Sequence, residues 1–222
     1  MWIHESVKKS RKLKDQYQMS GVSVFIKDAL PEEVDAEFVF NYVSSRVPLF
    51  LTSNIDMIYV GQFPEFEERQ INAFFENDAI YVTNQQDDEM DMIEDIIHEM
   101  SHAVEQRLGD LIYGDSALER EFRAKRERLE VRLKKHYKTP PSFAINLEYD
   151  KGVDNFLYAE VGYDNLRQLI VGIFPTAYSV TSVSEYWAIG YEELFLGDRD
   201  RLKRMCPVLY NKLIITMKES EV

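Results

Sequence analysis

Cysteine and long apolar runs are scarce in this sequence of 222 residues. Its one cysteine, Cys206, excludes a disulfide within the chain, and we expect this thiol to be a small buried apolar side chain. No stretch approaches the roughly 18 apolar residues of a transmembrane helix, and the N-terminus carries no apolar run of signal-peptide length. We therefore expect a cytoplasmic protein, or one released by a route that needs no classical signal.

Positive charge is in deficit. The chain has 26 Lys and Arg against 39 Asp and Glu, a formal net charge of -13. Because phosphate groups repel such a protein, neither nucleic acid nor an anionic membrane is an expected partner. With 45% hydrophobic residues and no compositional seam, the sequence predicts a single domain over 1–222. Within it, 1–20 is polar and locally basic, which favours a solvated arm or helix.

The first part of the chain predicts three short strands. The stretches 21–26, 55–60 and 79–83 are rich in β-branched and aromatic residues. A helix is expected from Pro31, with Val34, Phe38, Val39 and Tyr42 on its apolar face, to just before Pro48. Residues 62–78 show no clear period.

The rest of the chain predicts mainly helices. They are expected at 89–108 with a stop at Gly109, at 116–135, at 156–173, at 182–196, and as a last helix or pair interrupted near Pro207. The fold class is therefore α+β, with a small mixed sheet and a mostly helical C-terminal half. The helix at 116–135 is expected to begin with a capping box, Ser116 to Glu119, and its alternating charges predict a solvated surface helix rather than a site.

One stretch carries a chemical motif, His98-Glu99-Met100-Ser101-His102, which reads H-E-x-x-H. On a helix the two histidines lie one turn apart on the same face, where both can bind one metal ion. Glu99 lies beside that ion, where a general base for water would stand. With four histidines in the chain, this spacing arises by chance in roughly one such chain in a hundred.

The helix expected to carry the motif has a regular amphipathic pattern. Apolar side chains follow one stripe, formed by Ile93, Ile97, Met100 and Val104. The opposite face is polar and consists of Asp91, Glu94, Asp95, His98, His102 and Glu105. A helix with one apolar stripe packs that stripe on a core, so the histidines should be held on a rigid element.

A catalytic zinc needs a third protein ligand and an open position for water. A metzincin would have Gly at 105 and His at 108, but this chain has Glu105 and Leu108, which excludes that class. Among the downstream acids, Glu160 is a possible ligand. Glu185 is another, although it also fits a capping box that begins at Ser182, and the spacing alone leaves both interpretations open.

These residues resemble a known family, the gluzincin zinc metallopeptidases, and most closely the anthrax lethal factor-like catalytic domain. The likeness covers about 79–218. It rests on the H-E-x-x-H followed three residues later by Glu105, on Glu185-Tyr186-Trp187-Ala188, on Tyr178 seven residues earlier, and on a Pro-containing terminal helix. Two positions depart from the family: Ser101 stands where Gly is frequent, and Ile189 where lethal factor has an acid.

The resemblance implies a zincin-like fold, in which the small sheet packs on the active-site helix, and an endopeptidase acting on a protein or peptide substrate. It implies one Zn²⁺ held by His98, His102 and Glu185. Glu99 would activate the zinc-bound water, and Tyr178 would help to stabilise the tetrahedral intermediate.

Three further interpretations stay open at this point. Glu105 would accept a hydrogen bond from a ligand imidazole, or is a solvated acid. By analogy, 79–83 is the edge strand along which a substrate lies. The alternative functions are a catalytically inactive zincin-fold domain that serves as an interaction or assembly module, and a metal-free helical interaction protein.

Overall fold

The structure is a computed structural model that describes residues 16–218. The chain divides after Arg107 into two compact units, Met1–Arg107 and Leu108–Val222. Whether they fold as the single domain expected from composition stays a prediction.

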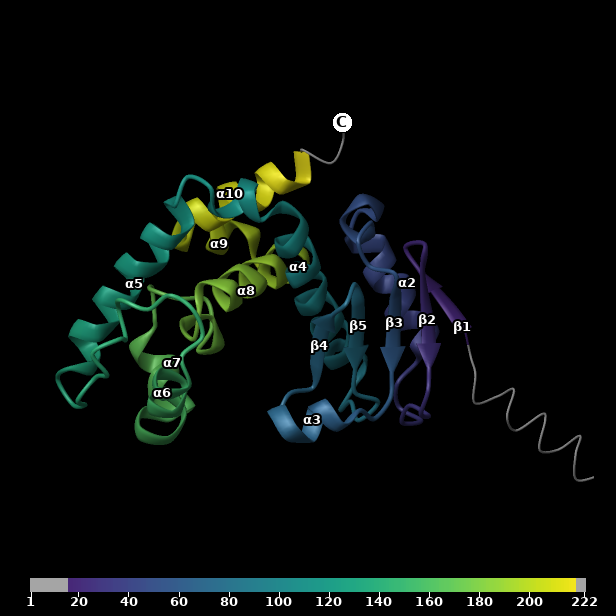
Figure 1. Cartoon of the computed structure of the whole chain (residues 1–222), viewed down its shortest axis with the longest axis horizontal. Coiled ribbons are helices and arrows are strands. Elements are labelled where there is room, and N and C mark those ends of the chain that lie inside the picture. The colour runs from purple at the N-terminus through teal and green to yellow at the C-terminus, as the bar shows by residue number, and fades with distance from the viewer. Residues whose placement is uncertain (1–15, 219–222) are drawn as a thin grey trace, which may run out of the picture. The chain divides into compact units, whose positions relative to one another are not determined.

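The first unit is built on a five-stranded mixed sheet (Figure 1). Its strands, in chain order, are β1 (Gln16–Met19), β2 (Val22–Ile26), β3 (Met57–Val60), β4 (Ala73–Glu76) and β5 (Ala79–Val82). Their spatial order is β1-β2-β3-β5-β4. The three strands β2, β3 and β5 run parallel, and β1 and β4 pair antiparallel at the two sides.

Strand β1 corrects the expectation of a polar arm or helix over 1–20. Ser20 and Gly21 both have positive φ, 49° and 81°, which is the geometry of a tight two-residue hairpin turn. This turn folds Gln16–Met19 back onto β2, so that Met19 pairs with Val22. The remainder of that prediction, 1–15, lies outside the described residues.

Within the described residues the edge strands of the sheet are β1 and β4, and the expectation that 79–83 forms an edge is wrong. Strand β5 lies between β3 and β4. The stretch 62–78, which showed no period, forms helix α3 (Pro64–Arg69) and then β4. Asn77 and Asp78 both have positive φ, so they turn β4 onto β5 as a hairpin without a glycine.

Helix α2 spans Ala36–Arg46, and a short 3₁₀ helix, η1 (Leu49–Thr52), follows it. The helix begins five residues later than expected from Pro31, because the Asp35 carboxylate accepts hydrogen bonds from the N–H groups two and three residues further on. Phe38 is 48% exposed and does not belong to the buried face as predicted.

Helix α4 spans Glu89–Tyr113 and carries the H-E-x-x-H motif. The Asp88 carboxylate caps its start by accepting hydrogen bonds from the first free N–H groups. The expected end near Gly109 is an interruption instead. Leu108 leaves the helical region, with φ -113° and ψ 21°, and the helix then continues to Tyr113.

The second unit is helical throughout its regular elements. They are α5 (Ala117–Leu133), α6 (Lys151–Asn155), the π-helical turn η2 (Phe156–Val161), α7 (Tyr163–Leu169), the 3₁₀ turn η3 (Tyr178–Val180), α8 (Val183–Phe195), α9 (Arg199–Met205) and α10 (Pro207–Lys218). Helix α8 packs against η3, α5, α9 and α10. The predicted α+β class, with a small mixed sheet and a mostly helical C-terminal half, is confirmed.

Helix α5 differs from its prediction in two ways. Ser116 is left-handed and its side chain caps nothing; the Asp115 carboxylate accepts the hydrogen bond from the N–H of Ala117 instead, so there is no capping box. The helix is also not simply a solvated surface helix, because Lys125 and Arg126 are buried. Cys206 is buried as expected.

Over residues 16–218, no helix combines the length and the apolar character needed to cross a membrane.

Candidate metal centre

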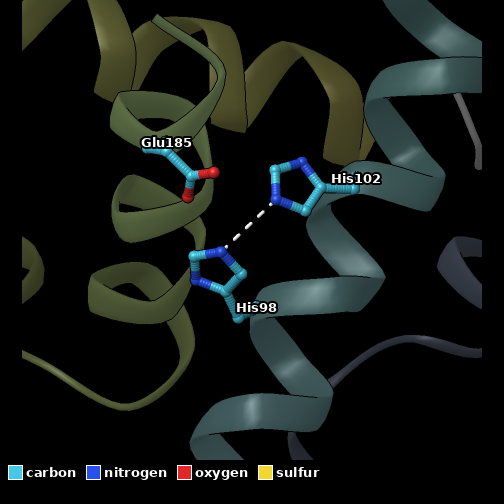
Figure 2. Close-up of side chains that lie close together, drawn as sticks. All are labelled: His98, His102 and Glu185. Carbon is cyan, nitrogen blue, oxygen red and sulfur yellow. Dashed lines mark hydrogen bonds between the residues drawn. The ribbon is translucent and has the colours of Figure 1, made fainter. Parts of the chain in front are cut away.

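The two histidines of the motif lie one helical turn apart on α4, with ring centroids 5.1 Å apart in an edge-on arrangement. The predicted apolar stripe of this helix, Ile93, Ile97, Met100 and Val104, is fully buried. On the other face the Nε2 atoms of His98 and His102 lie 3.3 Å apart (Figure 2). The helix is also tied to its own unit where Asn54 donates a hydrogen bond to the Ala103 carbonyl. The sequence pattern therefore places the pair on a rigid element, as predicted.

The spacing of these nitrogens fits a shared metal ion. Two Zn–N bonds of about 2.0–2.1 Å that meet at a tetrahedral angle place their nitrogens about 3.3 Å apart. This is the observed Nε2–Nε2 distance between His98 and His102. Without a metal, one of these nitrogens would have to carry a proton that points at the other.

Glu105 selects which nitrogen of His102 faces the site. One of its carboxylate oxygens lies 3.1 Å from His102 Nδ1, so Nδ1–H donates to Glu105 and the lone pair of the neutral ring is on Nε2. The predicted contact of Glu105 with an imidazole of the motif is present, while the role of that imidazole as a metal ligand stays a prediction. Such a partner fixes the orientation of a ligating histidine and makes it a better ligand.

Glu99, the candidate base, is buried, with 7% of its surface exposed. It lies close enough to Asp95 that its charge helps to raise the pKa of that carboxyl. The larger cause is burial, and together they raise the pKa of Asp95 from its ordinary value to about 6, although a hydrogen bond from Gln86 opposes the shift. Sequence analysis placed Asp95 only on a polar face, because partial burial of an acid leaves no mark on helical periodicity.

Glu185 supplies the third possible ligand. The possible ligand atoms of His98, His102 and Glu185 all lie within 4.8 Å of one another, and Figure 2 shows the carboxylate turned toward the imidazoles. Two imidazoles and one carboxylate are a donor set that suits zinc. The residues present therefore fit a metal ion of this kind, although nothing in the structure identifies the metal.

The first turn of α8 explains how Glu185 is held. Ser182 is the N-cap, and its hydroxyl accepts a hydrogen bond of 3.0 Å from the Glu185 N–H. The capping interpretation of this segment therefore holds for the serine, while the Glu185 carboxylate belongs to the histidine cluster. Glu160, the other candidate ligand, is exposed in η2 and is not part of that cluster.

Tyr178 begins η3, within the same unit as Glu185. Its side chain is 43% exposed, and its carbonyl accepts hydrogen bonds from the N–H and hydroxyl of Thr181. Its segment is thus folded against the start of α8. A catalytic role for the hydroxyl stays a prediction.

Comparisons with protein-family models, with curated proteins and with solved structures found no match. The resemblance to gluzincins therefore rests on the motif residues alone.

Proposed function

We propose that this protein is a zinc-dependent endopeptidase of the gluzincin type, with a zincin-like fold. The observation that carries the proposal is the His98–His102 pair, whose Nε2 atoms have the separation that a tetrahedral zinc requires. The Glu185 carboxylate, which lies close to both histidines, would be the third protein ligand. The lethal factor-like resemblance of the sequence supports the same assignment.

The proposed chemistry needs few groups. When bound, zinc supplies a Lewis acid that lowers the pKa of water and polarises a carbonyl group. Glu99, next to the first ligand in sequence, takes the proton from the attacking water and gives it to the leaving amine. Its low exposure helps to keep bulk water away from that transfer. The Tyr178 hydroxyl would donate a hydrogen bond to the oxygen on which negative charge develops.

A substrate site is also proposed on the sheet. Strand β4 has a neighbour on one side only within the described residues, and it runs antiparallel to β5. An extended peptide could add to such an edge through main-chain hydrogen bonds. This replaces 79–83 as the proposed edge strand.

The test is a comparison of the wild type with Glu99→Gln, which keeps the shape of the side chain but removes its basicity. Both proteins are assayed for bound metal by elemental analysis and for cleavage of a proteome-derived peptide library. We expect equal zinc content and a loss of cleavage of roughly 10²–10⁴-fold in the variant.

Three results would reject the proposal. Cleavage that survives in Glu99→Gln would exclude this residue as the base. A wild-type protein that holds zinc but cleaves nothing would favour the inactive interaction module, and one that holds iron would point to other chemistry for the same donor set.

A further inference from the structure

Arg126 is a fully buried arginine whose hydrogen bonds all go to backbone carbonyl groups. Its Nε and Nη2 donate to the Val180 carbonyl at 2.9 and 2.7 Å, and Nη2 also donates to Thr181 at 2.6 Å. On the other side, Nη1 donates to the carbonyls of Phe143 and Asn146 at 2.8 and 2.6 Å. One guanidinium therefore joins two segments that are more than 30 residues apart in sequence.

Burying the charged guanidinium of Arg126 costs free energy, because the charge loses its contact with water. Burial lowers the pKa of Arg126 to about 10, while the charge of Asp150 partly opposes that effect. The side chain still carries its charge at neutral pH, so the carbonyl dipoles must compensate for the lost water. They can do so only while they converge on the guanidinium, and this fixes the orientation of the peptide groups at Val180 and Thr181.

Those two peptide groups lie in the segment that leads into α8, the helix that carries Glu185. They follow Tyr178 and come directly before Ser182, the N-cap of α8, whose first turn holds Glu185. The second segment reinforces the same point, because the Leu147 carbonyl accepts a hydrogen bond of 2.8 Å from the N–H of Val183, the first residue of α8. Both segments bound by Arg126 thus meet at the start of this helix.

We propose that Arg126 is a positioning residue for the metal centre: by holding Val180 and Thr181, it sets the place from which Glu185 reaches the ion. This inference rests on the proposed function. Arg126 touches neither the metal nor the substrate in this proposal, and it acts through the first turn of α8.

Lys125 provides a matched control. It is the preceding residue of the same helix, is also buried, and also donates to two backbone carbonyls, those of Ile173 at 2.6 Å and Met205 at 2.8 Å. Neither carbonyl belongs to the Val180–Thr181 link. Its loss should therefore destabilise the unit without displacing Glu185.

The experiment measures zinc affinity of the full chain by competition with a chromophoric chelator, and the visible absorption of the Co²⁺-substituted protein. The proteins are wild type, Arg126→Met, Lys125→Met and, as the variant that lacks the ligand, Glu185→Ala. We expect Arg126→Met to bind zinc 10–100-fold more weakly than wild type, the usual effect of losing a group that orients a ligand. Its Co²⁺ spectrum should move toward that of Glu185→Ala, whereas Lys125→Met should stay within about threefold of wild type.

The inference is overturned if Arg126→Met binds zinc as wild type does, or if Lys125→Met loses as much affinity. Should Arg126→Met fail to fold, Arg126→Lys replaces it. An ammonium has three donors for the five hydrogen bonds made here, so we expect weaker zinc binding, and wild-type affinity would reject the inference. A wild-type protein that binds no zinc would instead reject the proposed function, and this inference with it.

Discussion

Helices α4 and α5 are consecutive in the chain, and both carry many charged side chains. On α4 two acids near the motif have side-chain partners: Glu105 contacts His102, and Asp95 accepts a hydrogen bond from Gln86. On α5 the charged groups that are withdrawn from water bind the backbone of other elements, as Arg126 does at Val180 and Thr181. Acids near the motif thus contact the candidate centre, whereas the buried charges of α5 hold the fold together.

The difference teaches that buried charge is informative only together with its partner. An acid beside an imidazole alters the ligand and the local pKa values, so its removal should change metal affinity or pH dependence. A charge that binds main-chain groups immobilises a segment, so its removal should change stability first. The predictions below test this division from the larger expected effect to the smaller.

The largest effect is expected for Glu121→Ala on α5. The Glu121 carboxylate accepts hydrogen bonds from the Tyr186 hydroxyl at 2.8 Å and from the N–H groups of Val208 and Leu209 at 2.9 and 3.1 Å. Its loss leaves a buried hydroxyl and the start of α10 without their acceptor, and should destabilise the protein by about 3 kcal/mol.

Chemical denaturation of metal-free protein measures this change, with Glu127→Ala as the control. Glu127 is exposed on the same helix, and its removal should alter stability by less than about 0.5 kcal/mol. Equal effects of the two variants would show that the charges of α5 do not hold the fold.

A smaller effect is expected for Asp95→Asn on α4. Burial, aided by the charges of Glu99 and Asp91, raises the pKa of Asp95 from 3.8 to about 6. Between about pH 4 and 6 the folded protein therefore keeps a proton that the unfolded chain releases, so this group makes wild-type stability fall as pH rises. Above pH 6 the full free-energy cost of ionising the buried Asp95 carboxyl is present. Asparagine avoids this cost and can still accept the hydrogen bond from Gln86.

We expect Asp95→Asn to be more stable than wild type by roughly 2 kcal/mol at pH 7 and about equal at pH 4. Thermal unfolding of both proteins in the presence of a chelator, across this pH range, gives the difference. A difference that does not vary with pH would contradict the role assigned to the buried carboxyl.

The smallest effect is expected for Glu105→Gln, also on α4. Glutamine can still accept from His102 Nδ1 but has no charge, so zinc affinity should fall about tenfold, or about 1.4 kcal/mol, while the stability of the metal-free protein stays unchanged. Chelator competition measures the affinity. Asp91 is an exposed acid of the same helix, so the Asp91→Asn variant should bind zinc as wild type does. A loss of zinc affinity in that variant would contradict the distinction between acids that contact an imidazole and acids that do not.

The histidine pair and its helix could be predicted because their signal is local. His98 and His102 are four residues apart, and the apolar stripe behind them has a helical period. Glu185 could be proposed as a third ligand only alongside Glu160. It lies 83 positions after His102, and sequence spacing over such a distance does not tell which acid the tertiary fold brings to the motif.

Arg126 shows why part of the fold could not be predicted. It stands in the buried row of α5, four residues after Phe122 and three before Leu129, which is a core position. The alternating charges around it favoured a solvated helix, and its carbonyl partners lie 17 to 55 residues away. The available signal for a buried arginine was its position, because Arg126 is in helical register with the apolar residues Phe122 and Leu129. The hairpin turns at Ser20-Gly21 and Asn77-Asp78 were missed for a different reason, because each follows a strand of only four residues, which is too short for its pattern to stand out.

Gly190 of α8 has a consequence for how the sequence can diverge. A Cβ added there would lie 2.5 Å from the nearest side-chain carbon of Leu209, which is itself fully buried on α10. Leu209 is also the residue whose N–H is bound by Glu121. Homologues should therefore exchange Gly190 for a larger residue only together with a smaller one at 209. Relatives that keep Leu209 should therefore also keep Gly190, so that Glu185-x-x-Ala188-x-Gly190 extends the candidate ligand motif by one packing constraint.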